Sequence, residues 1–502
     1  MSSPPSTLVG LQKGTYILSH ATSVTPLVVD LDGTLTPTDT LVESLVKAVK
    51  KSPFNLFRLP FWLLKGRSGF KEMVAQHGGI QAVTLPYRSD LLVYLQAEKA
   101  KGRQLILATA AHHSIADGVA SHLGIFDQVL ASTEAINLKG TAKLAAIQQT
   151  IGANFVYAGD SSSDVPIWES AKAAILVGVS VRTAQRVKNS TPVEQIFDAP
   201  PVKGTTWLKA LRIHQWLKNL LLFVPLLTAF SLLDTSKLFL MALGVLAFSL
   251  TASATYLVND LWDLDNDRVH PRKRHRPFAA ALLPIHHGLA VATALLVAGC
   301  VLAWLVSVGF LAMLLVYLAL TSIYSWVLKE YVLMDVIVLS LLYTLRILAG
   351  SVAVNIETSS WLLAFSVFVF LSLALVKRCA ELVTLEGQGI ASTRGRDYRV
   401  GDLVVLWPLG VGAALASVVV FGLFISAPET QIRYATPQLL WFVAIGLIYW
   451  LSRIWVQTSR GDMHDDPVVF AIKDPNSRIT VMVMVLLMLL AYVVPLKPFF
   501  QS

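Results

Sequence analysis

The chain has 502 residues, of which 54% are hydrophobic and 15% are charged, and its mean hydropathy is +0.60. A water-soluble enzyme of this size rarely reaches such values, so the composition predicts a membrane protein. The formal net charge is +9, but the basic residues gather in loops between apolar runs. This distribution indicates membrane topology and gives no reason to expect nucleic-acid binding.

Two regions of different character meet near "DAPPVKGTT" (198–206), where Pro, Gly and Thr interrupt both patterns. Residues 1–200 contain no long apolar run and are expected to form a soluble domain, whereas residues 201–502 are expected to form an integral membrane domain. The start, "MSSPPSTLVG", lacks the basic residues and apolar core of a secretory signal. We therefore expect the soluble domain to lie in the cytoplasm.

Short apolar runs alternate with helical patterns in the first region, which predicts an α/β domain with a doubly wound parallel sheet. The expected strands are "PLVVD" (26–30), "RQLILATA" (103–110), "NFVYAGD" (154–160) and "AAILVG" (173–178). In such sheets the chemistry lies at the carboxyl ends of the strands. Polar residues occupy those ends here: Asp30, Asp32, Thr109, Asp160 and Asp164.

Two of these carboxylates stand two residues apart, in the sequence Asp30-Leu31-Asp32-Gly33-Thr34. Gly33 permits the turn that brings both toward one site. Asp30 can then attack phosphorus while Asp32 acts as acid and base, and a divalent ion would offset their mutual repulsion. The alternative is a simple acidic turn, since Asp and Gly are common in turns.

The ordered set of this motif, Thr109, "LKGTAK" (138–143) and "GDSSSD" (159–164) resembles the haloacid dehalogenase superfamily of phosphatases over roughly residues 25–180. The resemblance implies Asp30 as nucleophile, Asp32 as acid/base and Thr109 as a phosphate contact. It also implies a Mg²⁺ site formed by Asp30, Asp32, Asp160 and Asp164. The positive group is Lys143 or Lys139, and Lys143 is favoured because it lies within the helical pattern "AKLAAIQQ".

Residues 37–100 lie between the first two motifs and would form a helical cap. One stretch of this cap, "FNLFRLPFWLLKGRSGF" (54–70), is both apolar and basic. It is therefore suited either to lying on a membrane surface or to covering a lipid-like substrate.

Apolar runs long enough to cross a bilayer recur throughout the second region. Nine spans are predicted, and the loops after the even-numbered spans hold most of the Lys and Arg residues, which again places the soluble domain in the cytoplasm. The spans are 217–233, 238–258, 288–306, 308–327, 331–350, 360–377, 404–425, 437–453 and 478–496.

An acidic stripe follows the second span. Asn259, Asp263 and Asp267 recur every four residues, which on one helix places three oxygen ligands on the same face. Such ligands suit Mg²⁺, which usually bridges a protein to diphosphate oxygens. The basic residues that follow, Arg268, Lys273, Arg274 and Arg276, either balance the remaining phosphate charge or serve only as a topogenic cluster.

The pattern N-x-x-x-D-x-x-x-D after a membrane span, followed by "RVHPRKRHRP", resembles the UbiA-type prenyltransferases over about residues 205–500. Most such enzymes carry a second motif, D-x-x-x-D; this chain has Asp335 but Leu339 four residues later, which counts against ordinary prenyl transfer. Alongside the acidic stripe, the resemblance implies these substrate-binding residues: Lys218, Asp260, His270, Lys273, Arg276, Asp335, Lys377, Arg378 and Arg396.

Further stretches, "LRIHQWLKNLLLFVP" (211–225) and "LVKRCAEL" (375–382) among them, look like the phosphoribosyltransferase branch of that family, which acts on decaprenyl phosphate. The resemblance implies transfer of 5-phosphoribosyl from phosphoribosyl pyrophosphate to a polyprenyl phosphate in the plasma (inner) membrane, with Mg²⁺ in both domains. The fused phosphatase would then remove the 5-phosphate. An aromatic or quinone prenyltransferase and a transporter are the alternatives, and an oligomer is compatible with the sequence.

One further charge, Arg346, lies within the fifth expected span. A charge inside a membrane is costly, so it is usually either functional or able to reach the interface by snorkelling.

Overall fold

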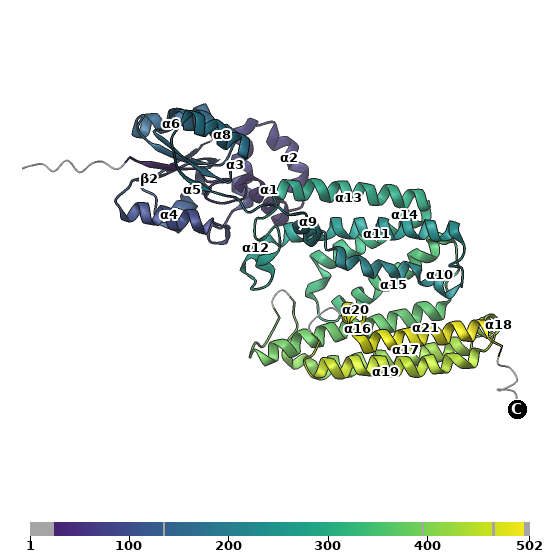
Figure 1. The fold of residues 1–502 in the computed structure, drawn as a ribbon. Coiled ribbons are helices and arrows are strands. Elements are labelled where there is room, and N and C mark those ends of the chain that lie inside the picture. The colour runs from purple at the N-terminus through teal and green to yellow at the C-terminus, as the bar shows by residue number, and fades with distance from the viewer. Residues whose placement is uncertain (1–24, 134–135, 394–395, 464–466, 496–502) are drawn as a thin grey trace, which may run out of the picture. The chain divides into compact units, whose positions relative to one another are not determined.

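The computed structural model describes residues 25–133, 136–393, 396–463 and 467–495, which form two compact units (Figure 1). The first unit holds the described residues up to Val202 together with Leu264–Ile285. The second holds Lys203–Asp263 and the described residues from His286 onward. The boundary expected between residues 200 and 201 assigns the segment Leu264–Ile285 to the membrane domain, whereas the structure groups this segment with the first unit.

A six-stranded parallel sheet forms the centre of the first unit, which confirms the predicted α/β class. The strand order is β3-β2-β1-β4-β5-β6. The central strand β1 pairs with β2 through Val28 and Ile106 and with β4 through Val28 and Tyr157. Two outer strands, β3 and β6, were not expected. The strands are β1 (Leu27–Val29), β2 (Leu105–His112), β3 (Gln128–Ser132), β4 (Val156–Gly159), β5 (Ala173–Val177) and β6 (Val193–Phe197).

Helices cover both faces of this sheet (Figure 1). Leu27 and Val29 pack into one core with α4 and α5, while Val28 packs into a second core that includes Trp168 of α7. This split follows from the alternation of side chains along a strand. The covering helices are α4 (Ser89–Ala100), α5 (His113–Leu123), α6 (Thr141–Ile151), α7 (Val165–Ser170) and α8 (Val181–Ser190), and η2 (Ser162–Asp164) precedes α7.

The insert between β1 and α4 is helical, as expected for a cap; α4 itself, which the expected range 37–100 included, packs on the sheet. Asp39 caps the first helix by accepting from Leu41 N and Val42 N. The third helix packs closely on the first, because a Cβ at Gly78 would lie 2.4 Å from Ser44 O. The insert comprises α1 (Thr40–Lys51), α2 (Asn55–Leu63), α3 (Gly66–Gly78) and η1 (Ala82–Thr84); the later segment of the same unit contains α12 (Leu264–Val269) and η4 (Lys273–His275).

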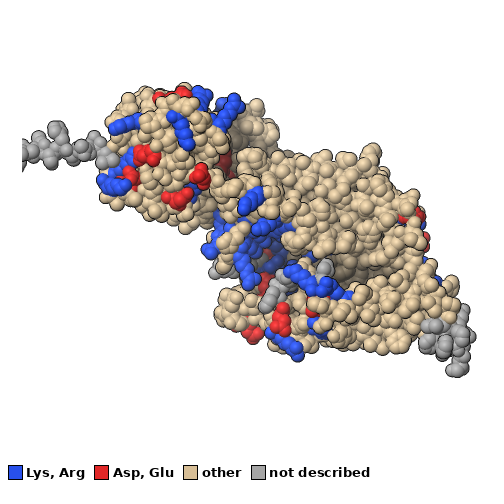
Figure 2. Space-filling model, viewed as in Figure 1, with Lys and Arg blue, Asp and Glu red and all other residues tan. Residues whose placement is uncertain are grey.

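Long apolar helices build the second unit, and eight in the described part of the chain are long and apolar enough to cross a membrane. Broad surfaces with few charged residues are visible on this unit in Figure 2, as expected for helices that face lipid. The eight candidate spans are α11 (Thr235–Trp262), α13 (Ile285–Val306), α14 (Val308–Trp326), α15 (Met334–Val354), α16 (Ser360–Gly387), α17 (Leu403–Ser426) with η6 (Val400–Asp402), α19 (Leu440–Ser459) with η7 (Pro437–Leu439), and α21 (Pro475–Val493). Shorter helices are α9 (Gly204–Ala210), η5 (Leu328–Glu330), α18 (Pro428–Arg433) and α20 (Pro467–Lys473).

The expected first span, 217–233, is wrong as a single long helix. It falls on η3 (Ile213–Phe223) and α10 (Val224–Thr228), and Phe230 adopts a positive φ of 53°. Pro225 near the start of α10 lacks the N–H that a continuous helix would use. The backbone of η3 also packs directly on α15, where a Cβ at Gly350 would lie 2.1 Å from Leu222 O. The last expected span ends at residue 496, just outside the described residues.

Candidate active sites

The acidic cluster of the first unit lies where the strand order reverses. Asp30 follows β1 and Asp160 follows the neighbouring strand β4, so both carboxylates stand at the switch point where α/β sheets bind ligands. Gly33 has a positive φ of 78°, and a Cβ there would lie 2.1 Å from Asp160 Oδ2. The turn that carries Asp30 therefore requires glycine at this position.

Lys143 provides the positive charge beside the expected nucleophile. Its Nζ lies 2.7 Å from Asp30 Oδ2 and 3.7 Å from Asp164 Oδ1, and the side chain is buried. Lys139, the alternative, is exposed. Sequence reasoning missed Tyr157 of β4, whose hydroxyl donates to Asp164 Oδ1 at 3.0 Å and accepts from Lys143 Nζ at 3.0 Å. Its position in an apolar strand gave no hint of this role.

Three carboxylates, those of Asp30, Asp160 and Asp164, have ligand atoms within 4.8 Å of one another. Burial is the main cause that raises the pKa of Asp160 to about 7, with the charges of Asp30 and Asp164 adding to it. Burial also raises the pKa of Asp30, and Lys143 opposes that shift. Such a crowded set of hard oxygen donors fits a divalent cation such as Mg²⁺, whose charge would remove the repulsion.

Asp32 stands outside this group of three. Its Oδ1 accepts a hydrogen bond from Thr40 N at 2.8 Å, and burial, followed by the charge of Asp39, raises its pKa to about 7. A carboxyl with this pKa can both donate and accept a proton near neutral pH. The raised pKa is suited to acid/base work, and the expected roles of Asp32 as acid/base and as metal ligand both stay predictions.

Two further polar residues lie near this site. Thr109 is fully buried within β2, three residues before the end of that strand at His112, and its hydroxyl accepts from Ala111 N at 3.0 Å. Lys71, on cap helix α3, donates to Ala110 O and Asn137 Oδ1, both at 2.7 Å. Sequence reasoning missed Lys71, because no local pattern links residue 71 to Ala110 of β2 or to Asn137.

The acidic stripe of the membrane half is not one continuous helix. Helix α11 ends at Trp262, Asp263 is its C-cap, and a separate short helix, α12, carries Asp267. Asn and Asp compete with helical hydrogen bonds, and "NDLWDLDND" concentrates them at this break. Within the second unit, Asn259 Nδ2 donates to Ser325 Oγ at 3.1 Å, and Lys329 Nζ lies 3.4 Å from Asp263 Oδ2.

Two expected substrate-binding residues lie on other parts of the second unit. Asp260 is buried and forms an ion pair with Arg212. Lys218 Nζ lies over the ring of Tyr343, 5.6 Å from its centroid. Arg212 in turn lies over the ring of Tyr256 at 4.9 Å, so both cations contact an aromatic face.

The segment Leu264–Ile285, described within the first unit, holds four of the expected site residues: Asp267, His270, Lys273 and Arg276. Asp267 is buried, and its Oδ2 lies 2.6 Å from Arg276 Nη1. His270 Nδ1 accepts from the backbone N–H groups of Arg272 and Lys273 at 3.2 and 3.3 Å, which closes the basic turn.

Arg268 in this segment does not point to solvent. Its guanidinium contacts both carboxylate oxygens of Glu43, at 2.6 and 3.0 Å, and the Glu43 side chain is fully buried. Lys47 also reaches Asp265 at 2.9 Å. Helix α1 of the cap is thus paired with α12 by two ion pairs within the first unit.

Asp335 stands where the resemblance places a second acidic motif, and its carboxylate is fully engaged. Arg378 Nε donates to Asp335 Oδ2 at 2.5 Å, and Tyr398 OH donates to Asp335 Oδ1. Arg378 also pairs with Glu381, and Arg396 Nη1 lies 3.6 Å from Glu381 Oε1. Lys377, the neighbour of Arg378 on α16, is half-buried.

Arg346 is 6% exposed and lies in the interior of the second unit. Its Nε donates to Asn219 Oδ1 at 3.0 Å, Nη1 to Leu342 O at 2.6 Å and Nη2 to Tyr317 OH at 2.9 Å. Snorkelling is therefore wrong for this residue, because its donors bind partners inside the helical unit.

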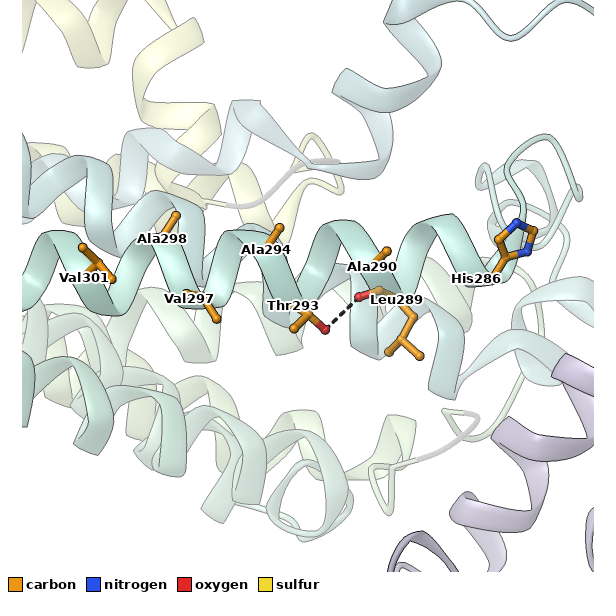
Figure 3. A pocket seen from close by; sticks show the side chains of 8 residues that line it. All are labelled: His286, Leu289, Ala290, Thr293, Ala294, Val297, Ala298 and Val301. Atoms are coloured by element: carbon orange, nitrogen blue, oxygen red, sulfur yellow. Dashed lines mark hydrogen bonds between the residues drawn. The ribbon is translucent and has the colours of Figure 1, made fainter. Parts of the chain in front are cut away.

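A shallow depression along α13 carries no comparable chemistry. Figure 3 shows that its lining side chains all come from this one helix, where Thr293 Oγ1 donates back to Leu289 O at 3.0 Å. Apart from His286, the lining contains no ionisable side chain. Such a surface suits contact with lipid tails.

Comparison with known proteins confirms both families that the sequence resembles. A model of the UbiA prenyltransferase family matches residues 220–472, and a model of haloacid dehalogenase-like hydrolases matches residues 27–169. An uncharacterized protein of Sinorhizobium fredii, y4nM, is 41% identical over 462 residues, which cover 90% of this chain and 88% of the relative.

Two named relatives match parts of the chain. Nodulation protein NoeC of Azorhizobium caulinodans is 37% identical over 284 residues, or 57% of this chain and 92% of the relative. Decaprenyl-phosphate phosphoribosyltransferase of Mycobacterium tuberculosis is 35% identical over 239 residues, or 46% of this chain and 78% of the relative. The chain therefore belongs to the UbiA prenyltransferase family and carries a haloacid dehalogenase-like hydrolase domain on its N-terminal side.

Proposed function

We propose that this chain is a bifunctional enzyme of the cytoplasmic face of the plasma membrane. Its membrane domain transfers 5-phosphoribosyl from phosphoribosyl pyrophosphate to a polyprenyl phosphate. Its hydrolase domain then removes the 5-phosphate and leaves polyprenyl-phosphoryl ribose. Support for the donor comes from the relative named decaprenyl-phosphate phosphoribosyltransferase, of which this chain covers 78%.

The hydrogen bonding of the Asp335 carboxylate is the observation that carries the proposal. Leu339 replaces the second acid of the family motif, and Arg378 and Tyr398 engage the acid that remains. Nη2 of Arg378 and Nε of Arg396 are buried and have no hydrogen-bond partner among the described residues. This position therefore offers donors for an anion in place of ligands for a second metal, which favours a substrate with more phosphate than a prenyl diphosphate.

In the transfer step, the bond between the ribose anomeric carbon and the diphosphate breaks, and a lipid phosphate oxygen forms the new bond. Asn259, Asp263 and Asp267 are the oxygen ligands proposed to hold Mg²⁺, which would neutralise charge on the leaving diphosphate. Positive charge to offset the phosphates would come from Lys218, Lys273, Arg276 and Lys377. Asp260 and His270 are proposed as further substrate contacts.

In the hydrolase step, Asp30 attacks the phosphorus of the 5-phosphate and Asp32 gives a proton to the departing ribose oxygen. Water then releases phosphate from Asp30 with Asp32 as base. Lys143, 2.7 Å from Asp30, and the hydroxyl of Thr109 would stabilise charge on the transferring group. The carboxylates of Asp30, Asp160 and Asp164 would hold Mg²⁺.

A comparison of two donor–acceptor mixtures tests the proposal. The full chain in lipid nanodiscs with Mg²⁺ is given either phosphoribosyl pyrophosphate and polyprenyl phosphate or a prenyl diphosphate and an aromatic acid. We expect ribose label to enter the lipid phase only in the first mixture. Reaction in the second mixture alone would replace the proposal with an aromatic or quinone prenyltransferase that carries a phosphatase for another substrate.

A further inference from the structure

Helix α2 of the cap exposes an unusual amount of apolar surface. Six large side chains along or beside it are exposed, with Phe57 at 73%, Phe61 at 68% and Leu64 at 83%. The exposed set, called the α2 patch below, is Phe54, Leu56, Phe57, Phe61, Leu63 and Leu64. Other exposed large apolar side chains in the described part of the first unit, such as Val93 and Val181, are scattered singly.

The opposite side of α2 fixes this orientation. Asn55 and Trp62, two helical turns apart, are 2% and 5% exposed. Asn55 Nδ2 donates to Ala48 O at 2.8 Å, and the Trp62 ring packs on His77 with a centroid distance of 4.7 Å. Because these two residues fasten the helix to α1 and α3, the α2 patch cannot turn inward without breaking both contacts.

Leaving the α2 patch in water is unfavourable. Each large apolar side chain gains free energy when it leaves water, so a surface that collects six of them is typical of a binding face.

Charge around the α2 patch identifies the occupant. Residues 44–71 contain seven Lys or Arg and no Asp or Glu. Arg58, Lys65 and Arg67 are exposed beside the apolar side chains. An apolar face bordered by cations fits the headgroup boundary of an anionic bilayer. A second copy of the same patch would bring like charges together, and the membrane-spanning helices of this chain ensure that a bilayer is present.

We propose that the α2 patch inserts into the headgroup region of an anionic bilayer and holds the cap on the membrane surface. The apolar side chains enter the acyl boundary while Arg58, Lys65 and Arg67 bind lipid phosphates. A cap held in this way keeps the hydrolase cluster at a surface where a lipid-linked phosphate is presented. The binding itself does not depend on which phosphate the hydrolase accepts, so it can fail or hold independently of the proposed function.

Depth-dependent fluorescence quenching tests the insertion in the full chain. In a background with Cys300→Ala and Cys379→Ala, an environment-sensitive dye is attached at Phe57→Cys or, as control, at Val181→Cys, which is 88% exposed on α8. The nanodiscs contain phosphatidylglycerol and nitroxide-labelled phosphatidylcholine. We expect quenching at position 57 to be at least about threefold stronger than at position 181.

The charge requirement is tested in the same samples. Changing Arg58, Lys65 and Arg67 to Gln, or replacing phosphatidylglycerol by phosphatidylcholine, should lower quenching at position 57 at least about twofold. Equal quenching at positions 57 and 181 would overturn the proposal. Quenching by aqueous iodide is measured as well. A dye at position 57 that is protected from iodide but not quenched by the labelled lipid would also overturn the proposal, because protein, for example a second copy, would then cover the patch.

Discussion

Replacing Lys143 with Met removes a buried ammonium and keeps most of the side-chain volume. The ammonium lies 2.7 Å from Asp30 and 3.7 Å from Asp164. Both carboxylates stay buried in the variant, together with Asp160 of the same 4.8 Å cluster. Removing one partner of a buried ion pair typically costs about 3–5 kcal/mol, so we expect the Lys143→Met variant to lose about 3 kcal/mol of local stability when no divalent ion is present.

The loss should depend on pH in one direction. Burial raises the pKa of Asp30, and Lys143 is the strongest influence that lowers it, so the pKa rises further in the variant. A carboxyl whose pKa is higher in the folded than in the unfolded state loses stability as pH rises from the unfolded toward the folded pKa. The deficit of the variant therefore grows with rising pH and shrinks in acid, where Asp30 takes up a proton.

Hydrogen exchange of the peptides that contain β1 and β4 measures this deficit in the full chain with EDTA. At neutral pH we expect about a hundredfold faster exchange in Lys143→Met than in the wild type, which corresponds to about 3 kcal/mol. Added Mg²⁺ should narrow the difference. The matched control is Lys139→Met, which removes an exposed charge four residues away. Equal effects of the two variants, or a deficit that grows in acid, would refute the reasoning.

Three further predictions concern metal binding, the buried ion pair and transfer. Mg²⁺ affinity of the hydrolase cluster should fall about tenfold per unit below about pH 7, because a proton on Asp160 competes with the ion; calorimetry that finds no pH dependence would contradict this. Arg268→Met should speed hydrogen exchange of α1 and α12 about a hundredfold, because it leaves the buried Glu43 carboxylate without its partner. Adding Glu43→Met should restore at least about half of the local stability that is lost, and no restoration would argue against the unpaired carboxylate as the cause. Asp263→Asn should slow transfer at least about a hundredfold, and unchanged turnover with the same Mg²⁺ requirement would leave that acid a structural role.

Local patterns were sufficient for the strands that carry the chemistry. The runs that became β1, β2, β4 and β5 are apolar, which indicated the strands, and those of β1 and β4 lead directly into Asp30 and Asp160, which indicated the site. The outer strands β3 and β6 escaped notice because edge strands need little apolar character; three of the five residues of β6, "VEQIF", are exposed.

Contacts between distant parts of the chain could not be predicted. Glu43 and Arg268 are 225 residues apart, and nothing near either residue announces the other. Tyr157 reads as an ordinary strand residue, although its hydroxyl lies among the carboxylates. The helix break at Asp263 was also missed, because the four-residue spacing of the acids matches one helix whether or not the backbone continues.

Following the 5-phosphate of the donor tests the central claim, which is that two consecutive reactions take place on one chain. The full chain in nanodiscs receives polyprenyl phosphate and phosphoribosyl pyrophosphate labelled separately in the ribose and in the 5-phosphate. We expect the wild type to place ribose label in the lipid and to release the 5-phosphate label as inorganic phosphate, whereas Asp30→Asn, with its poorer nucleophile, should retain both labels in the lipid. Release of 5-phosphate at the wild-type rate by Asp30→Asn, or ribose label that never enters the lipid with either protein, would contradict the account.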